Sequence, residues 1–407
     1  MTVYNPADPR LVTDPGPYLD EIRSTNPVHF APGGYWVVSR HADVNALLRN
    51  KDASSDALHA DPAKQPVGVR DRRQDQIAQL RAGAEDTRPF LFRDAPDHTR
   101  LRGLVQKAFT PRRVSELIPF IERETSTLLD ALVGAGSVDV VHELAWRVPV
   151  AVICEMLAIP ASDHDTFETQ SAQLARGLDP DFLLSDDDRR GRDAAILHFG
   201  LYFHELFAER RRNPGDDLLS ALVAARDGED SLSEGELLST TILLLVAGHE
   251  TTMNLISGSL RLLAEDPALA SQLRANPSLD RTAVEEFLRV VSPVQLTGRT
   301  MAADVSVGDH VIERGTFAFL LLAAANRDPD VFDHPTTVQL DRASNPNLGF
   351  GFGMHHCLGA PLARLETQIV LRQVLERTSS LAVSGTPVQR PNIVLRGLEH
   401  LPLTLTP

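Results

Sequence analysis

The sequence predicts a mainly α-helical fold with small β-sheets, built as one domain over residues 1–407. Apolar residues recur at helical spacing from about residue 97 to residue 290. Within that stretch, a helical pattern without proline begins at Ser233 and extends for about 30 residues, or roughly 45 Å. Strand patterns are short and few, and no repeat or low-complexity linker separates two parts of the chain.

The helices are marked by their apolar spacing and by their ends. Residues 117–133 carry an apolar stripe on one face, and residues 149–160 are apolar nearly all round, which predicts a buried helix. Ser233, with Glu236 three positions later, has the form of a capping box, which marks the start of the long helix. A helix of that length must cross the whole core.

The strand predictions fall near the two ends of the chain. Residues 33–40 follow a glycine turn and read as a strand, residues 305–311 read as a hairpin, and residues 316–322 read as a further short strand. Residues 60–95 are rich in Arg, Asp, Gln and Pro, so we expect a long loop there.

The composition is that of a folded globular protein, with 43% hydrophobic and 23% charged residues. The formal net charge of −15 disfavours nucleic acid and anionic membranes as partners. The longest apolar run, residues 317–325, is far shorter than the about 20 residues of a membrane span. Two cysteines, Cys154 and Cys357, form no disulfide framework. We therefore expect a cytoplasmic, monomeric protein in which Cys154 belongs to the core.

Residues 349–359 are the most informative segment, because four glycines surround Cys357 within eleven residues. Glycine allows unusual backbone angles and the close approach of a flat ligand. Pro361 fits the first turn of a helix that follows, so Cys357 would sit at a helix N-terminus, where a thiolate is favoured. A buried structural cysteine is the plain alternative. A zinc site would need further ligands, and the adjacent His355 and His356 cannot easily converge on one ion.

The pattern Phe350-x-x-Gly353-x-x-x-Cys357-x-Gly359 resembles the haem-binding loop of the cytochrome P450 family. Four fixed residues at fixed spacing make this motif specific, and three further matches follow the family's order over most of the chain. The resemblance implies the cytochrome P450 fold, with haem b between the long central helix and the helix after Cys357. It also implies that Cys357 is the metal ligand, bound to the haem iron.

The middle of the long helix carries Ala247-Gly248-His249-Glu250-Thr251 between apolar segments. The Thr251 hydroxyl is expected to bond back to the Ala247 carbonyl, and Gly248 removes a side chain, so a notch forms. In isolation, such polar residues more often face solvent. The segment resembles the oxygen-binding segment of the family, which implies that Ala247 and Gly248 lie against the haem. Glu250 and Thr251 would then manage proton delivery as the catalytic pair.

Two further matches concern the surroundings of the haem. Glu286 and Arg289 share one helix face, and the resemblance implies a structural network in which they meet Arg342. His98 and Arg102 also share a face, as solvent-exposed pairs commonly do. By resemblance, four residues hold the haem propionates, for which arginine has a suitable bidentate fork: His98, Arg102, Arg299 and His355.

The resemblance implies a monooxygenase that inserts one oxygen atom from O2 into an organic substrate. No flavin or nicotinamide motif is evident, so electrons would come from NAD(P)H through ferredoxin reductase and ferredoxin. Residues 93–113 are basic on an acidic protein, which suits an acidic carrier, although a solvated helix face is the alternative. Reversing Arg112 and Arg113 should slow reduction by ferredoxin.

The substrate pocket should be mostly apolar, which favours a lipophilic substrate over a polar one. Ordinary core packing is the alternative for each of its residues. The expected lining residues are Phe90, Phe92, Leu243, Val246, Ala247, Val294 and Leu296, with a C-terminal turn at residues 395–401.

Two other functions are compatible with a haem thiolate. A peroxygenase would take hydrogen peroxide in place of oxygen and electrons, although the retained Glu250 and Thr251 argue against it. A haem-based sensor or carrier would bind without turnover. Turnover with hydrogen peroxide alone would indicate the peroxygenase, and failure to consume NAD(P)H with any of a broad lipophilic library would indicate the sensor or carrier.

Overall fold

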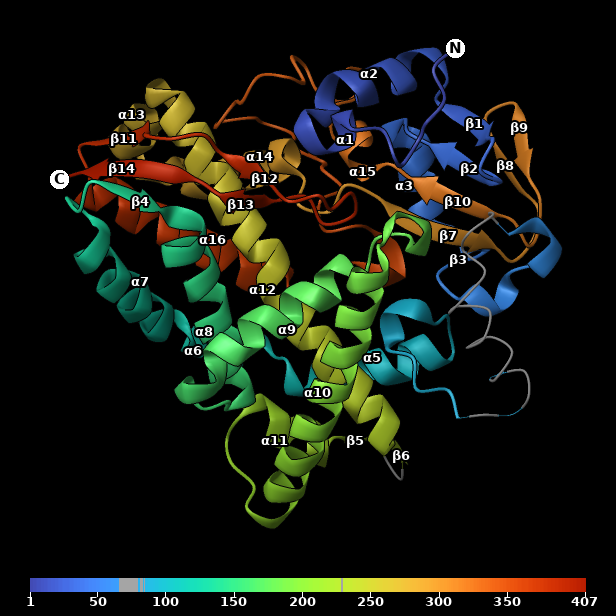
Figure 1. Ribbon diagram of the computed structural model, residues 1–407. Helices are drawn as coiled ribbons and strands as arrows, with labels where there is room; N and C mark the ends of the chain where they lie inside the picture. The colour runs from blue at the N-terminus through green and yellow to red at the C-terminus, as the bar shows by residue number, and fades with distance from the viewer. Residues whose placement is uncertain (66–79, 81–82, 84, 228–229) are drawn as a thin grey trace.

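The computed structural model describes residues 1–65, 80, 83, 85–227 and 230–407 of the chain. Helices make up most of it, and the largest sheet lies to one side, close to the N-terminus (Figure 1). The prediction of a mainly α-helical fold with small sheets is confirmed. Within the described residues, none of the helices combines the length and apolar character that crossing a membrane requires.

The helices share the amphipathic or fully apolar patterns that the sequence carries, and most are joined by short connections. In chain order they are α1 (Arg10–Thr13), α2 (Pro15–Thr25), α3 (His41–Arg49), α5 (Asp97–Ala108), α6 (Pro111–Glu116), α7 (Ile118–Leu132), α8 (Arg147–Leu157), α9 (His164–Arg176), α10 (Asp186–Arg212), α11 (Leu218–Ala224), α12 (Glu234–Glu265), α13 (Pro267–Ala275), α14 (Asp280–Val291), α15 (Leu322–Ala325) and α16 (Ala360–Arg377).

The strands form one five-stranded sheet in the order β1-β2-β10-β7-β3, one three-stranded sheet in the order β11-β14-β4, and three two-stranded ribbons. In the large sheet only β2 and β10 pair in parallel. The strands are β1 (Val28–Ala31), β2 (Tyr35–Val38), β3 (Ala53–Ser54), β4 (Ser137–Asp139), β5 (Arg226–Asp227), β6 (Asp230–Ser231), β7 (Thr297–Met301), β8 (Val305–Val307), β9 (His310–Ile312), β10 (Phe317–Leu320), β11 (Ser380–Val383), β12 (Val388–Gln389), β13 (Leu398–His400) and β14 (Pro402–Thr406).

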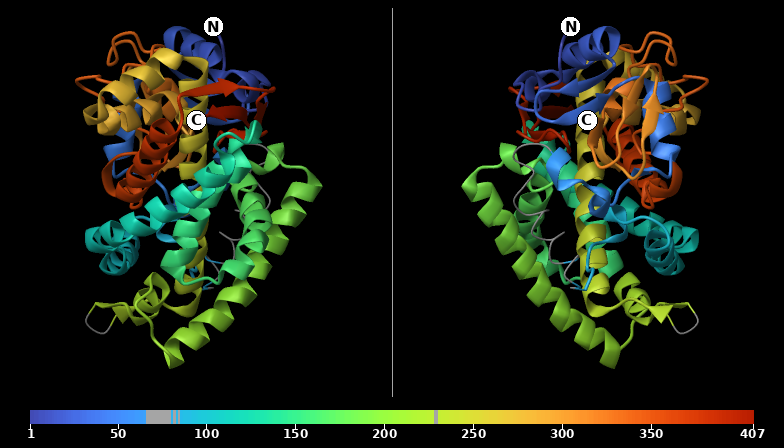
Figure 2. Two further views of the ribbon diagram at one scale, coloured as in Figure 1. Left: turned by 90° about the vertical axis from the view of Figure 1, so that its left-hand side faces the viewer. Right: turned by 90° about the vertical axis from the view of Figure 1, so that its right-hand side faces the viewer.

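The long helix α12 organises the helical part. Ser233 caps it as predicted, because its hydroxyl accepts the N–H of Glu236 while the Glu236 carboxylate accepts the N–H of Ser233. The helix continues for 32 residues to Glu265 and packs against α8, α14 and α16. Figure 2 shows it as a column through the middle of the molecule, with α10 slanting along one outer side. One continuous helix therefore connects the three helices that pack against it.

The remaining predicted elements agree with the structure except at their boundaries. The hairpin at 305–311 is β8 and β9, and the strands at 33–40 and 316–322 are β2 and β10. The apolar run at 317–325 changes from strand to helix at Leu322. The buried helix predicted from 149 begins at Arg147, directly after a π-helical turn at 141–146 that the sequence pattern did not reveal. Of the loop predicted at 60–95, residues 66–79, 81–82 and 84 lie outside the described residues.

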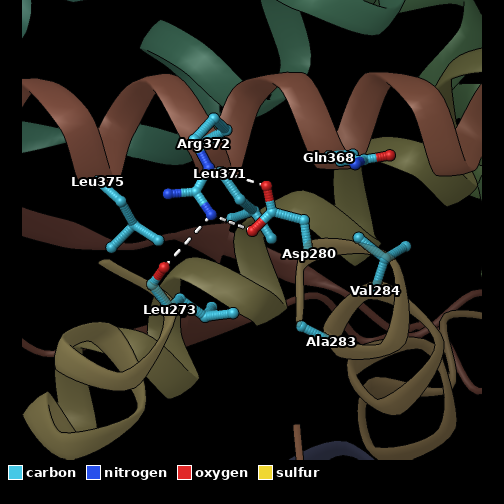
Figure 3. A pocket seen from close by; sticks show the side chains of 8 residues that line it. All are labelled: Leu273, Asp280, Ala283, Val284, Gln368, Leu371, Arg372 and Leu375. Atoms are coloured by element: carbon cyan, nitrogen blue, oxygen red, sulfur yellow. Dashed lines mark hydrogen bonds and ion pairs between the residues drawn. The ribbon is translucent and has the colours of Figure 1, made fainter. Parts of the chain in front are cut away.

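A small pocket lies where α13, α14 and α16 meet, and Figure 3 shows it from close by. Arg372 on α16 forms a two-point ion pair with Asp280 there and also donates to the Leu273 carbonyl. The volume of about 10 Å³ is room for no more than about one water molecule, so this pocket is no substrate site. Its residues join three helices behind the site described next.

Candidate functional site

The loop before α16 is shaped by its glycines. Gly351 and Gly353 have φ angles of 65° and 71°, in the left-handed region that favours glycine. At Gly353 a Cβ would also come within 2.5 Å of the Leu48 carbonyl oxygen, so a side chain has no room there. The N–H of Cys357 donates to the Phe350 carbonyl at 2.9 Å, which closes the loop. The spacing of the sequence motif is thus a backbone requirement.

The sulfur of Cys357 lies at the N-terminus of α16, as predicted, and its side chain is exposed. The protein around it still desolvates the sulfur, and this burial raises the pKa of Cys357. The backbone N–H groups of Gly359 and Ala360 act in the opposite direction and lower that pKa, as does the positive charge of Arg102. The sulfur therefore has donors and a cation aimed at it and remains open to a ligand, in contrast to Cys154, which is buried in the core as expected.

Four predicted anion-binding residues gather near this loop although they come from three distant segments. The rings of His98, on α5, and His355 lie with their centroids 4.4 Å apart and are tilted by 59°. Arg102 donates to the His356 carbonyl at 2.7 Å, and Arg299 on β7 donates to the Gly298 carbonyl at 2.7 Å. Across the described ranges, no carboxylate lies within ion-pair distance of Arg102 or Arg299. The cluster therefore concentrates donors and positive charge without a matching anion.

The electrostatics of this cluster show the same imbalance. Burial, and then the charges of Arg299 and Arg102 and the neighbouring His98, lower the pKa of His355 to about 3. Burial lowers the pKa of Arg299 to about 10. All four ring nitrogens of His98 and His355 are buried and have no hydrogen-bond partner among the residues that the structure describes. Buried polar atoms are almost always paired, so these residues point to an anionic group that they would bind.

The hydrogen bond expected within α12 is present. The Thr251 hydroxyl donates to the Ala247 carbonyl at 3.1 Å, and Ala247 is exposed in the middle of a mostly buried helix. Gly248 has a second function that its place in the motif did not indicate. A Cβ there would lie 3.1 Å from the side chain of Ile153, so this glycine lets α8 pack closely against α12.

Glu250 is buried and its carboxylate is held by side chains that the sequence did not single out. Arg390, which follows β12, donates to Glu250 Oε2 at 2.9 Å, and His249 Nε2 lies 3.6 Å from Oε1. Burial acts to raise the pKa of Glu250, but His249 and Arg390 outweigh it and lower that pKa overall. A buried acid requires a cation, but 140 residues separate Arg390 from Glu250, so spacing along the chain could not identify it.

Comparison with known proteins identifies the family. A family model described as cytochrome P450 matches residues 196–397. The chain is 39% identical to cytochrome P450 107B1 of Saccharopolyspora erythraea over 381 residues, which cover 90% of this chain and 88% of that protein. The chain belongs to the cytochrome P450 family. It is also 37% identical to the vitamin D(3) 25-hydroxylase of Pseudonocardia autotrophica, over 97% of this chain and 94% of the relative.

The fold agrees with solved cytochrome P450 structures. The structure of PksS, the cytochrome P450 of the Bacillus subtilis bacillaene polyketide synthase, covers all of both chains with a TM-score of 0.88 and 32% identity. The protein described here is accordingly an oxidoreductase of the monooxygenase class. Its family has a haem-thiolate iron cofactor, a small-molecule substrate and redox partners. In this fold the long central helix is α12, and the helix that follows Cys357 is α16.

The residues present fit a haem. The accessible sulfur of Cys357 would bind the iron, and the unpartnered nitrogens of His98 and His355 would bind propionate oxygens together with Arg102 and Arg299. The ring of Phe350, on the loop before α16, has its centroid 4.4 Å from the guanidinium of Arg364, which belongs to α16. When bound, haem iron supplies the activation of dioxygen that no side chain of the chain can perform.

Behind the loop, Glu286 forms the predicted contacts with two buried arginines. Arg289 binds its carboxylate at 2.7 and 2.9 Å, and Arg342 binds it at 2.9 and 3.1 Å. The N–H of Gln339 and the amide of Asn345 donate to the same carboxylate. Every oxygen is thereby satisfied, and the segment that leads into the Cys357 loop is fastened to α14.

The predicted pocket residues do not all come together. Phe90, Leu243 and Val246 share the main apolar cluster, and Val294 packs against it and pairs with Leu395. Phe92 is half-buried beside Phe90. Leu296 lies in a different cluster, with Tyr4 and Ile393, so it packs against the N-terminal segment. Val294, two positions before it, instead packs against the main apolar cluster, so the two side chains have different neighbours.

The basic segment is smaller than its sequence suggested. Arg93 and Arg100 turn toward Glu236, and Arg102 turns inward to the His356 carbonyl as expected. Arg112 on α6 remains 87% exposed, with Glu116 as its partner one turn later. The exposed positive charge that remains on this segment is therefore centred on α6.

Proposed function

We propose that this cytochrome P450 inserts one oxygen atom of O2 into a lipophilic substrate by hydroxylation or epoxidation, with haem b bound through Cys357. One observation carries the proposal. An accessible thiol with two backbone N–H groups aimed at it lies beside a buried, anion-free cluster of His98, Arg102, Arg299 and His355. We assign this work to a single domain over residues 1–407.

The anion-free cluster binds the propionates in this proposal. Arg102 and Arg299 supply the charge, and the two histidines donate hydrogen bonds from their buried ring nitrogens. Because the four residues come from α5, β7 and the loop before α16, they fix the orientation of the bound group relative to α12.

Glu250 and Thr251 manage protons on the α12 side. The Thr251 hydroxyl bonds to the Ala247 carbonyl at 3.1 Å and can rotate away from it toward a ligand in the notch. Glu250 is held by Arg390 at 2.9 Å and stays a carboxylate because its pKa is lowered, so it can accept hydrogen bonds from the water molecules of a proton relay. Ala247 and Gly248 supply the space, because neither carries a side chain beyond Cβ.

A lipophilic substrate is supported by the apolar residues at the notch and by the relatives. Phe90, Leu243, Val246 and Val294 offer carbon surface close to Ala247 on α12 or to the strand pair at Leu395. Vitamin D(3), the substrate named for the relative that is 37% identical, is an apolar secosteroid. Phe92 stays a candidate lining residue in this proposal, and Leu296 does not.

Electrons come from NAD(P)H through ferredoxin reductase and ferredoxin in this proposal. The exposed Arg112 on α6, a helix that packs against α16, is the centre of the docking surface, with Arg113 beside it. Both cysteines are free, which suits the reducing cytosol where such carriers work, and we assign the protein to that compartment as a monomer.

The ferrous–carbon monoxide difference spectrum tests the haem assignment. We expect the signature of a thiolate ligand in the native protein and its loss in Cys357→Ala, whereas Cys154→Ala is the matched control and should keep it. A lipophilic library screened for substrate-induced shifts of the Soret band then identifies ligands. Turnover with hydrogen peroxide alone, and none with NAD(P)H and a ferredoxin chain, would replace the proposal by a peroxygenase.

A further inference from the structure

A second cluster of ligand-type side chains lies away from the haem site. Within the described ranges, Asp139, His142 and His400 place three possible ligand atoms within 4.8 Å of one another. They belong to the end of β4, the π-helical turn at 141–146 and the end of β13. None of them is among the residues assigned above to haem, oxygen or substrate.

The carboxylate of Asp139 is held in place by the backbone. Its Oδ1 accepts the N–H groups of Val141 at 3.1 Å and Leu401 at 2.9 Å. Oδ2 faces His400, whose Nδ1 lies 2.6 Å away. One oxygen is therefore used to fix the geometry, and the other is presented to the histidines. Such orientation of a ligand by hydrogen bonds is typical of metal sites.

The two histidines approach from different elements. The rings of His142 and His400 have their centroids 5.2 Å apart, tilted by 45°. Antiparallel pairing of β14 with β4, which sets Pro402 opposite Asp139, holds His400 beside the carboxylate. Two imidazoles and one carboxylate are a donor set for zinc and similar transition metals, whereas calcium and magnesium take oxygen ligands.

We propose that Asp139, His142 and His400 bind one Zn²⁺ ion. The ion takes the place of the proton between His400 Nδ1 and Asp139 Oδ2, which is released on binding, and His142 supplies the third ligand. The side chain of His400 is 48% exposed, so water can complete a tetrahedral set. An ion here joins β4, the π-helical turn and β13, which pairs with the strand that leads into Arg390.

Titration calorimetry of the haem-loaded, tag-free protein with zinc chloride provides the first test. We expect one ion per chain. His142→Gln and His400→Gln should each weaken zinc binding by about tenfold or more. Losing an outer-shell partner of a metal ligand already costs about tenfold, and these two residues are direct ligands in the proposal. His204→Gln is the matched control, because His204 is an exposed histidine on α10, remote from this cluster, and binding should be unchanged.

A second variant separates binding from folding. Asp139→Asn keeps an amide oxygen to accept the N–H groups of Val141 and Leu401, so its melting temperature in chelator should match that of the native protein. Its zinc affinity should fall like that of the histidine variants, because an amide is a poor zinc ligand.

X-ray absorption at the zinc edge, which haem iron does not obscure, gives the donor set directly. We expect two imidazole nitrogens and light-atom donors at about 2.0–2.2 Å. Absence of stoichiometric binding in the native protein, or binding that is equal in the native protein and in the three ligand variants, would overturn the proposal.

Discussion

The two sides of the haem site proposed here are constructed differently. Around Cys357 the backbone determines the geometry: glycines at positive φ, a closing hydrogen bond to Phe350, and a buried Glu286 network behind the loop. On α12 the helix is regular, and the geometry of the acid depends on Arg390, a side chain from a distant hairpin. Backbone constraints depend on residues that are close together in the sequence, whereas the Arg390–Glu250 ion pair joins distant residues. The two sides should therefore respond differently to substitution.

The largest effect is expected on the Cys357 side, from Glu286→Gln. The neutral amide leaves the charges of Arg289 and Arg342 unbalanced in a site where Glu286 and Arg289 are fully buried. Breaking such a buried pair costs about 3–5 kcal/mol of the free energy of unfolding. Chemical denaturation measures this cost.

Glu285→Gln is the matched control for Glu286→Gln. Its carboxylate pairs with Arg364 at a half-exposed position one residue away, and exposed pairs contribute about 0–1 kcal/mol. Equal losses in the two variants would mean that the buried network does not fasten the loop.

A smaller effect is expected on the α12 side, from Arg390→Gln. This variant leaves the Glu250 carboxylate with His249 alone and should lower stability at neutral pH by about 2–3 kcal/mol. Arg261→Gln breaks an exposed pair with Glu265 on the same helix and should cost less than about 1 kcal/mol.

The pH dependence gives the sign of this effect. In the native chain the pKa of Glu250 is lowered, so the pair stabilises the fold above the ordinary pKa and loses this contribution as the pH falls through the lowered pKa. Loss of Arg390 raises the pKa of Glu250, so the variant should differ least from the native protein below the lowered pKa, where the acid is protonated in both. A deficit that stays constant from neutral to acidic pH would show that Arg390 acts through packing alone.

The glycine loop offers a contrast between two alanine variants. Gly351→Ala should lower the free energy of unfolding by about 1–2 kcal/mol, because alanine disfavours the left-handed backbone conformation. No steric clash adds to this, because the nearest neighbour of the new Cβ would be 3.8 Å away. Gly353→Ala has the same conformational cost. Its Cβ would also clash with the Leu48 carbonyl oxygen at 2.5 Å, which adds about 1 kcal/mol or more. Thermal unfolding and haem content measure both; equal values would mean that the loop can move away from α3.

The smallest effect is expected at the surface. Arg112→Glu with Arg113→Glu should leave stability nearly unchanged and slow reduction by ferredoxin by about three- to fivefold at low salt, since exposed pairs contribute under about 1 kcal/mol. Arg190→Glu is the matched control, because Arg190 is also exposed and pairs with Asp187 within its own helix. Reduction rates that do not differ between these variants at any ionic strength would remove α6 from the docking surface.

These contrasts also show what the sequence could predict. The capping box of α12, the glycines before Cys357 and the Glu286–Arg289 spacing are local patterns, and the structure has each feature where the pattern lies. Arg390 could not be predicted because its partnership with Glu250 depends on how a C-terminal hairpin folds back over α12. The packing of Leu296 could not be predicted for a related reason, since its cluster is formed with the N-terminal segment around Tyr4.

The adjacent imidazoles of His98 and His355 also have a consequence for assembly. His98, Arg299 and His355 are brought from three parts of the chain into a region where positive charge and unpaired nitrogens repel closure. Haem-free protein should therefore be least stable in this region, and haem binding would hold α5, β7 and the cysteine loop together. Resistance to limited proteolysis around residue 98 should then rise in step with haem incorporation.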